Sequence, residues 1–226
     1  MAQFEYLKSA VNSIKKGEID AIVTLPINKE SIRYAGFDFP GHTEYFAFQF
    51  NVKDFAMMLA NSKLKVVLET IHIPLKEVPE KISTDSIFKK VLLIDKTFPG
   101  EKIAVAGLNP HAGEDGLFGN EEKRIIKPAI EKAKTFGIDV CGPFPSDTVF
   151  NRAVLGEFGT VLCMYHDQGL IPVKLTGFNE TVNITLGLPF VRTSVGHGTA
   201  YDIAGKGIAD IGSFLRAVEV AVELLG

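Results

Sequence analysis

The sequence has few cysteines, no long apolar run and no large excess of charge of either sign. Its two cysteines, Cys141 and Cys163, form no CxxC pair, which excludes a disulfide framework and a zinc finger as the organising feature. Apolar runs such as residues 91–94 are far shorter than the roughly 20 residues of a membrane span. Lys and Arg number 24 against 27 Asp and Glu, so we expect no nucleic-acid partner, no membrane partner and a cytoplasmic location.

The two common nucleotide-binding motifs are also missing. No GxGxxG segment and no Walker A segment occurs among the 226 residues, so the sequence supports neither a Rossmann nor a P-loop site. A glycine-dense segment, residues 196–207, leads into a helix and is able to bring backbone N–H groups close to a phosphate. A plain tight loop explains the same pattern.

The composition that remains is that of a folded α/β protein. With 46% hydrophobic and 23% charged residues, the chain has length for one large domain or two small ones, and composition shows no internal boundary. The pattern predicts helices over about 3–16, from 42, 83–97, 120–136 and 211–225, and strands or apolar runs at 21–25, 56–59, 65–70, 103–106, 160–165 and 182–186. This alternation favours a mainly parallel sheet, whose ligands gather beyond the carboxyl ends of its strands.

Three of the five histidines share one context, because His72, His111 and His166 each follow an apolar run. Imidazoles delivered to one sheet edge are able to bind zinc, cobalt, iron or nickel. The alternative is that each histidine only hydrogen-bonds its own loop. Asp167 and Asp147 lie near these positions and would widen the choice to magnesium or manganese, although Asp147 is equally explained as the N-cap of a helix.

Two basic residues stand at the ends of apolar runs rather than on a charged helix face. Arg192 is suited to clamp a phosphate, and a half-buried Lys174 is suited to proton transfer. Both are also explained as ordinary residues that extend their charged ends to solvent. Residues 41–44 resemble a helix N-terminus, where unpaired N–H groups attract anions.

Five segments together resemble the PdxA family of 4-hydroxythreonine-4-phosphate dehydrogenases: residues 40–44, 108–114, 142–150, 165–169 and 183–194. The resemblance covers essentially the whole chain, with the motifs in the family's order. It implies an α/β fold like that of the isocitrate and isopropylmalate dehydrogenases, with two α/β domains around a mainly parallel sheet. The family begins with a further N-terminal segment that bears its first strand. We therefore expect residues 1–226 to form a single family-like region whose first domain is incomplete.

The resemblance also assigns residues to roles. It implies metal ligands at His72, His111 and His166, with Asp147 and Asp167 beside the metal as catalytic residues. It implies a substrate site made of His42, Thr43, Lys174, Asn183 and Arg192, in which Lys174 is also the base or proton relay. It implies a cofactor loop with His197, Gly198, Thr199, Ala200 and Asp202.

The implied reaction oxidises 4-phosphooxy-L-threonine with NAD or NADP and decarboxylates it to 3-amino-2-oxopropyl phosphate, with zinc, magnesium or cobalt as the divalent metal. The implied assembly is a homodimer with active sites at the subunit interface. The alternatives are a related dehydrogenase of threonate or erythronate 4-phosphate, and an inactive truncated form. Where the family reads Val-Asp-His-Gly-Thr-Ala, this chain has Gly196, so one carboxylate near the cofactor loop is missing.

Overall fold

The computed structural model describes residues 2–34 and 36–226, which divide into two compact units. Unit 1 comprises Met1–Phe55 and Asn179–Gly226, and unit 2 comprises Ala56–Phe178. Unit 1 is thus made from both ends of the chain. The chain passes from one unit to the other without a Ser/Gly-rich linker, which is why composition shows no boundary. Within the described residues, no helix is long and apolar enough to cross a membrane.

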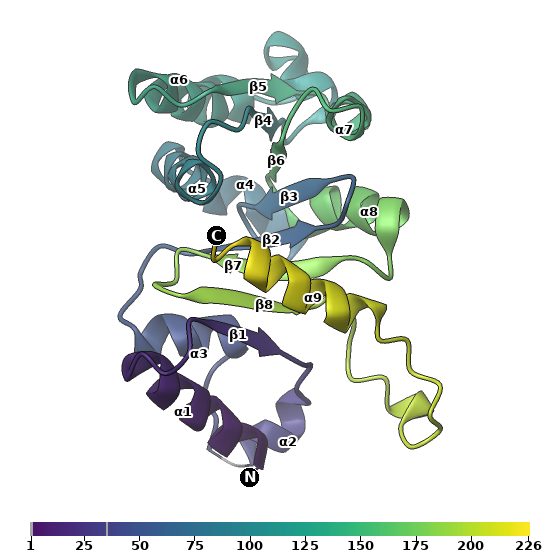
Figure 1. Ribbon diagram of the computed structural model, residues 1–226. Helices are drawn as coiled ribbons and strands as arrows, with labels where there is room; N and C mark the ends of the chain where they lie inside the picture. Colours follow the sequence, from purple (N-terminus) through teal and green to yellow (C-terminus); the bar gives the residue numbers. More distant parts are fainter. Residues whose placement is uncertain (1, 35) are drawn as a thin grey trace. The chain divides into compact units, whose positions relative to one another are not determined.

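Unit 1 is built on a small sheet in which β8 is central. The strands are β1 (Ala21–Thr24), β7 (Val182–Leu186) and β8 (Val191–Val195), with β8 parallel to β1 and antiparallel to β7. The helices are α1 (Ala2–Lys15), α2 (Lys29–Arg33), α3 (His42–Gln49) and α9 (Gly212–Glu223), and Tyr201–Ile203 forms a short 3-10 turn. Helix α9 lies across β8 (Figure 1).

An aromatic cluster forms the core beside α1 and α3. Phe46 on α3 is fully buried, and the ring of Phe37 lies 5.5 Å from Phe4 and 5.4 Å from Tyr45 between centroids. Leu7 and Val11, which are one turn apart, form the buried face of α1. This packing fixes α3, which carries candidate site residues at its N-terminus.

Unit 2 has a five-stranded sheet in the order β2-β3-β6-β4-β5. Only the β2–β3 pair is antiparallel, and the β3–β6, β6–β4 and β4–β5 pairs are parallel. The strands are β2 (Ala56–Ala60), β3 (Lys65–Leu68), β4 (Ile103–Ala106), β5 (Val140–Phe144) and β6 (Thr160–Cys163). The helices are α4 (Val78–Lys81), α5 (Thr84–Thr97), α6 (Lys127–Thr135), α7 (Ser146–Val154) and α8 (His166–Gly177).

Most of the predicted elements of unit 2 are confirmed, but β3 ends at Leu68, α4 and α7 are not predicted, and further segments differ. Residues 140–144, for which the sequence pattern predicts no strand, form the edge strand β5. The strand predicted over 160–165 ends at Cys163, because α8 begins at His166. The apolar residues 170–173 lie within α8 and bury Leu170 and Val173 against the sheet, despite Pro172 inside the helix. Tertiary packing therefore outweighs the local helix-breaking signal.

Candidate functional site

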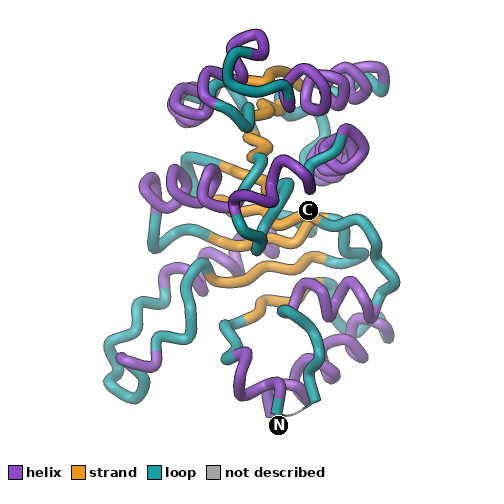
Figure 2. Tube along the Cα trace, turned by 180° about the vertical axis from the view of Figure 1, so that it is seen from behind, coloured by secondary structure: helices purple, strands orange, loops and turns teal. Residues whose placement is uncertain are grey.

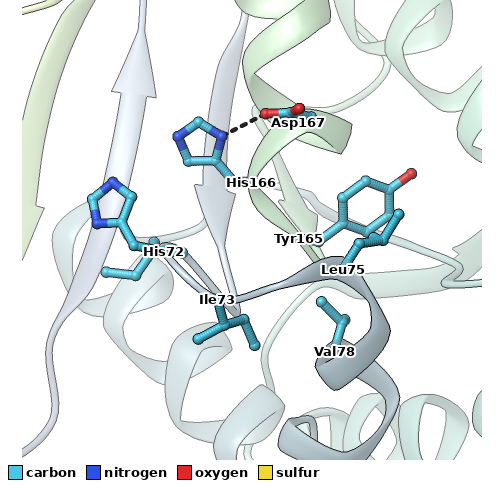
Figure 3. Close-up of a pocket in the computed structure, with 8 residues that line it drawn as sticks. His72, Ile73, Leu75, Val78, Tyr165, His166 and Asp167 are labelled. Carbon is cyan, nitrogen blue, oxygen red and sulfur yellow. Dashed lines mark hydrogen bonds and ion pairs between the residues drawn. The ribbon is translucent and has the colours of Figure 1, made fainter.

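The first candidate site lies at the carboxyl ends of the parallel strands of unit 2. His72 follows β3 and His166 follows β6, the neighbouring parallel strand. Their rings are 5.6 Å apart between centroids and line one pocket of about 330 Å³ (Figure 3). The pocket is lined by Ile71, His72, Ile73, Leu75, Val78, Tyr165, His166 and Asp167. Strand order brings these two histidines together although 94 positions separate them in the sequence.

Asp167 orients the His166 ring. Its Oδ1 lies 2.6 Å from Nδ1 of His166, the contact drawn as a dashed line in Figure 3. When Nδ1 carries the proton in this hydrogen bond, the Nε2 lone pair is left for another ligand. Carboxylates in this relation to a histidine hold the ring in the orientation that metal binding requires.

His111 lines a neighbouring pocket of about 360 Å³, together with Asp147. Tyr165 lines both this pocket and that of His72 and His166. The pocket is lined by Leu108, Asn109, Pro110, His111, Ser146, Asp147 and Tyr165. Asp147 lies in the first turn of α7 and is not its N-cap. The N-cap residue is Pro145, and no side chain forms a capping hydrogen bond at this end of the helix.

His111 begins a turn with unusual backbone geometry. Residues 111–115 all have positive φ, between 37° and 81°, within the turn Pro110–Gly116. Of these five residues only Gly113 is a glycine, and each of the others adopts a conformation that costs roughly 1 kcal/mol or more. Such strain persists only where surrounding contacts hold it.

Two buried side chains that the sequence analysis did not single out hold this region. Glu122 is 2% exposed and accepts hydrogen bonds from the backbone N–H groups of Leu108 and Asn109 at 2.8 and 2.7 Å. Gln168 donates to the Gly107 carbonyl at 2.7 Å and accepts from the N–H of Met164 at 2.5 Å. Glu122 lies near the start of the helix predicted over 120–136, and its burial distinguishes it from the adjacent Glu121.

The donor types around these pockets suit a divalent metal ion, but only in part are they brought together. His72 and His166 face one space and offer two imidazole ligands. Across residues 2–34 and 36–226, no group of three His, Cys, Asp or Glu side chains is close enough to hold a metal. His111 lies in the neighbouring pocket, and the three-histidine centre therefore stays a prediction.

The second candidate site lies on one face of the sheet of unit 1. Arg192 on β8 is 4% exposed, and its guanidinium donates to three threonine hydroxyls, at 2.7 Å to Thr24, 3.0 Å to Thr185 and 3.5 Å to Thr43. Among the residues that the structure describes, neither its Nε nor the buried Oδ1 of Asn183 on the same face has a hydrogen-bond partner. Arg192 is therefore a buried cation with one N–H donor that lacks an acceptor atom among the described residues.

The electrostatics of this face favour an anion. Burial lowers the pKa of Arg192 to about 10, so the guanidinium stays protonated at neutral pH. Burial, and then the charge of Arg192, lower the pKa of His42 to about 4, so its imidazole is neutral. His42 opens α3 and is 9% exposed. One uncompensated positive charge therefore dominates the site.

The remaining predicted residues lie elsewhere. Lys174 is half-buried on α8 of unit 2, with its Nζ 5.7 Å from the centroid of the Phe178 ring, and it lines neither of the two pockets described above. The predicted cofactor loop runs from β8 to α9 and extends away from the sheet of unit 1 (Figure 2). Its predicted residues are exposed: His197, Gly198, Thr199, Ala200 and Asp202.

Comparison with known proteins places the chain among dehydrogenases. Residues 1–221 match the family described as pyridoxal phosphate biosynthetic protein PdxA. The chain is 51% identical over 225 residues to 4-hydroxythreonine-4-phosphate dehydrogenase of Desulfosudis oleivorans, covering 96% of this chain and 67% of the relative. It is 47% identical over 227 residues to D-threonate 4-phosphate dehydrogenase of Salmonella typhimurium, covering 98% and 69%. The chain thus spans about two thirds of the length of these relatives.

Solved structures show the same relationship. A crystal structure of 4-hydroxythreonine-4-phosphate dehydrogenase from Klebsiella pneumoniae has a TM-score of 0.90 and 43% identity, covering 99% of this chain and 70% of that one. Isocitrate dehydrogenase from Methylococcus capsulatus has a TM-score of 0.54 at 15% identity, covering 96% and 71%. The second likeness concerns the fold alone and confirms the predicted isocitrate dehydrogenase-like class.

Proposed function

The chain belongs to the family of pyridoxal phosphate biosynthetic protein PdxA, and on that premise we propose that it oxidises 4-phosphooxy-L-threonine. The oxidant is NAD or NADP, and the product of oxidation and decarboxylation is 3-amino-2-oxopropyl phosphate. The reaction belongs to the synthesis of pyridoxal phosphate. Relatives about half identical to this chain carry the name of this dehydrogenase, which supports the proposal.

The observation that carries the proposal is the buried Arg192 with its unpartnered Nε. A substrate with a phosphate and a carboxylate offers the acceptor oxygens and the negative charge that this group lacks. His42 and Thr43 lie at the start of α3, and Thr43 contacts Arg192 directly. These residues bind and orient the anionic part of the substrate, and Asn183 accepts from one of its donor groups.

The chemistry proposed for unit 2 uses a divalent ion, zinc, magnesium or cobalt, held by His72 and His166 and, by the family resemblance, His111. When bound, such an ion supplies Lewis acidity toward the substrate hydroxyl and toward the oxygen on which negative charge develops. Asp167 holds the His166 ring by its contact with Nδ1, which leaves Nε2 for the ion. Asp147 lies beside His111 and is a further acidic residue of this region.

The proposed oxidation removes one proton from the C3 hydroxyl and one hydride from C3. Lys174 is the proposed base for the proton of the C3 hydroxyl, and the nicotinamide, when bound, would supply the acceptor for the hydride on C3. The resulting β-keto acid loses its carboxyl group as carbon dioxide, and the electron pair left behind takes up a proton. The exposed loop between β8 and α9 is the proposed contact with the adenosine side of the cofactor. Its proposed contact residues are His197, Gly198, Thr199, Ala200 and Asp202.

We propose a homodimer as the working form, with active sites at the subunit interface. Exposed apolar side chains follow one another along α8 and at the C-cap residue that ends it: Ile171, Leu175 and Phe178. Surfaces of this kind are buried when two copies of a chain associate. A sedimentation measurement that finds only monomers at micromolar concentration contradicts this part of the proposal.

A second candidate substrate is D-threonate 4-phosphate, because a relative 47% identical to this chain carries that name. Both substrates present a phosphate and a carboxylate, so Arg192 and the histidine pocket serve either one. The difference lies at C2, where 4-phosphooxy-L-threonine has an ammonium group and threonate a hydroxyl.

The deciding experiment measures NADH or NADPH formation by the purified chain with each substrate, in the presence of zinc, magnesium or cobalt. We expect NAD or NADP to be reduced with 4-phosphooxy-L-threonine, but not with unphosphorylated 4-hydroxythreonine. Reduction with D-threonate 4-phosphate alone supports the second candidate. No reduction under any of these conditions overturns both and supports an inactive form of the family.

A further inference from the structure

Arg192 is a buried cation whose neighbours accept hydrogen bonds from its Nη groups without neutralising its charge. In the described part of the chain, no carboxylate forms an ion pair with it, and the nearest acidic influence is the charge of Glu44 at longer range. Buried arginines are normally paired with a carboxylate, because an isolated buried charge is costly. Arg192 instead has hydroxyl partners from three different elements: Thr24 on β1, Thr43 on α3 and Thr185 on β7.

The strand register explains how the threonines reach the guanidinium. In the antiparallel pair of β7 and β8, Ile184 lies opposite Thr193, so one step further places Thr185 opposite Arg192. On the other side of β8, Ile22 is the partner of Arg192, and Thr24 shares its face because it is two residues along β1. The guanidinium is therefore held between hydroxyls of two flanking strands.

The directions of the hydrogen bonds fix which atoms remain available. Thr24 donates its hydroxyl proton to the Thr193 carbonyl at 3.4 Å, which turns its oxygen lone pairs toward the guanidinium. Nη2 of Arg192 donates to Thr24, and Nη1 donates to Thr185. Nε alone has no partner. The two hydroxyls thus hold the Nη groups and leave the Nε edge for a ligand.

We propose that Thr24 and Thr185 are positioning residues, which hold the Arg192 guanidinium so that its Nε edge binds an oxyanion of the substrate. The inference rests on the proposed function for the identity of that substrate, and its chemistry is that of a phosphate or carboxylate group. Hydroxyls suit this task because they fix the planar fork and leave its charge for the ligand. A carboxylate in the same place would compete with the ligand for that charge.

The test replaces each hydroxyl by a methyl group of similar size, in Thr24→Val and Thr185→Val. Both variants keep a β-branched residue in a strand. Binding of inorganic phosphate and of acetate to the whole chain is measured by calorimetry, which requires no turnover. We expect each variant to weaken binding of the anion about tenfold, as for loss of one charged hydrogen bond. Stronger binding of phosphate than acetate identifies the phosphate as the group bound by Arg192, and the reverse identifies the carboxylate.

Two sets of controls separate positioning from a general structural effect. Thr24→Ser and Thr185→Ser keep the hydroxyl and are expected to restore binding to within about twofold of the original chain. Thr193→Val removes a buried hydroxyl on the opposite face, where it donates to the Ala217 carbonyl at 2.8 Å, and is expected to leave anion binding unchanged.

Measurements of anion binding and of turnover together distinguish the positioning role of the threonines from the proposed function. Loss of anion binding in the valine variants, with no dehydrogenase activity in the original chain, refutes the proposed function and leaves the positioning role standing. Activity in the original chain with an unchanged KM in both valine variants overturns the positioning role and leaves the function standing. Absence of phosphate and acetate binding by the original chain at millimolar concentration, or equal weakening by Thr193→Val, also overturns it.

Discussion

The carboxylate of Glu122 holds Asn109 at two points. Its Oε1 accepts from the Asn109 backbone N–H at 2.7 Å, and its Oε2 accepts from the Asn109 side chain at 3.0 Å. Asn109 immediately precedes the turn that carries His111. Glu122, 13 positions after Asn109 in the sequence, therefore supports the left-handed conformation of this turn.

Glu122→Gln is expected to destabilise the protein by about 1–3 kcal/mol, because an amide whose oxygen accepts from the two backbone N–H groups turns its NH2 group toward the Nδ2 donor of Asn109. The measurements are urea unfolding and hydrogen exchange at the amides of Leu108 and Asn109, which should lose protection. Glu131→Gln is the matched control, since Glu131 is exposed and pairs only with Lys134 on the surface of α6. Equal stability of the two variants contradicts the supporting role of Glu122.

His166→Ala is expected to abolish both turnover and metal retention, because it removes one imidazole of the pair with His72. Asp167→Asn keeps the ring and loses the charge behind Nδ1, so we expect about 10- to 100-fold weaker metal binding. Metal content by mass spectrometry and a competition titration with a chelator measure these effects. His197→Ala, in the exposed loop of unit 1, should retain its metal. Normal activity and metal content in His166→Ala exclude this residue as a ligand.

The buried His42 makes the stability of the protein depend on pH. Its pKa is lowered to about 4 in the folded chain from an ordinary value of 6.5, so between these values the unfolded chain binds the proton and the folded chain does not. Protonation of His42 thus leaves the free energy of unfolding unchanged above pH 6.5. It lowers this free energy by up to about 3 kcal/mol as the pH falls from 6.5 toward 4.

His42→Gln removes this proton linkage. Its free energy of unfolding in urea should fall less than that of the original chain between pH 7 and pH 4. His197→Ala removes an exposed histidine and should follow the original chain over the same range. If the His42→Gln curve runs parallel to the original one, His42 does not titrate abnormally in the folded protein.

By the family resemblance, an aspartate is expected where this chain has Gly196, and the local packing leaves little room for a larger residue. A Cβ at this position meets the Thr181 carbonyl oxygen at 2.5 Å, so the backbone has to shift. Gly196→Ala and Gly196→Asp are both expected to lower the free energy of unfolding by about 1–3 kcal/mol. Gly198→Ala is the control, because a Cβ there meets nothing within 4 Å. An unchanged unfolding midpoint in Gly196→Asp shows that the strands adjust at no cost.

Local sequence patterns were sufficient for most helices and strands. The runs at 103–106 and 182–186 coincide with β4 and β7, because apolar β-branched residues signal a buried strand within a few positions. The pattern predicted no helix at residues 166–177, where the structure has α8. Gly169 is required there because a Cβ would lie 2.9 Å from the Leu68 side chain, a contact that no local pattern records.

The candidate site also combines features predicted from the sequence with features that depend on the tertiary structure. The sequence by itself predicted His72, His111, His166 and Arg192 as candidates for the chemistry, since each follows an apolar run, but it gave no signal for Thr24 or Thr185. Only the tertiary structure decided which of them meet: strand order pairs His72 with His166, the turn held by Glu122 puts His111 in the neighbouring pocket, and register surrounds Arg192 with hydroxyls. The physical reason is that a strand is specified by its own residues, whereas proximity depends on hydrogen bonds between strands distant in sequence.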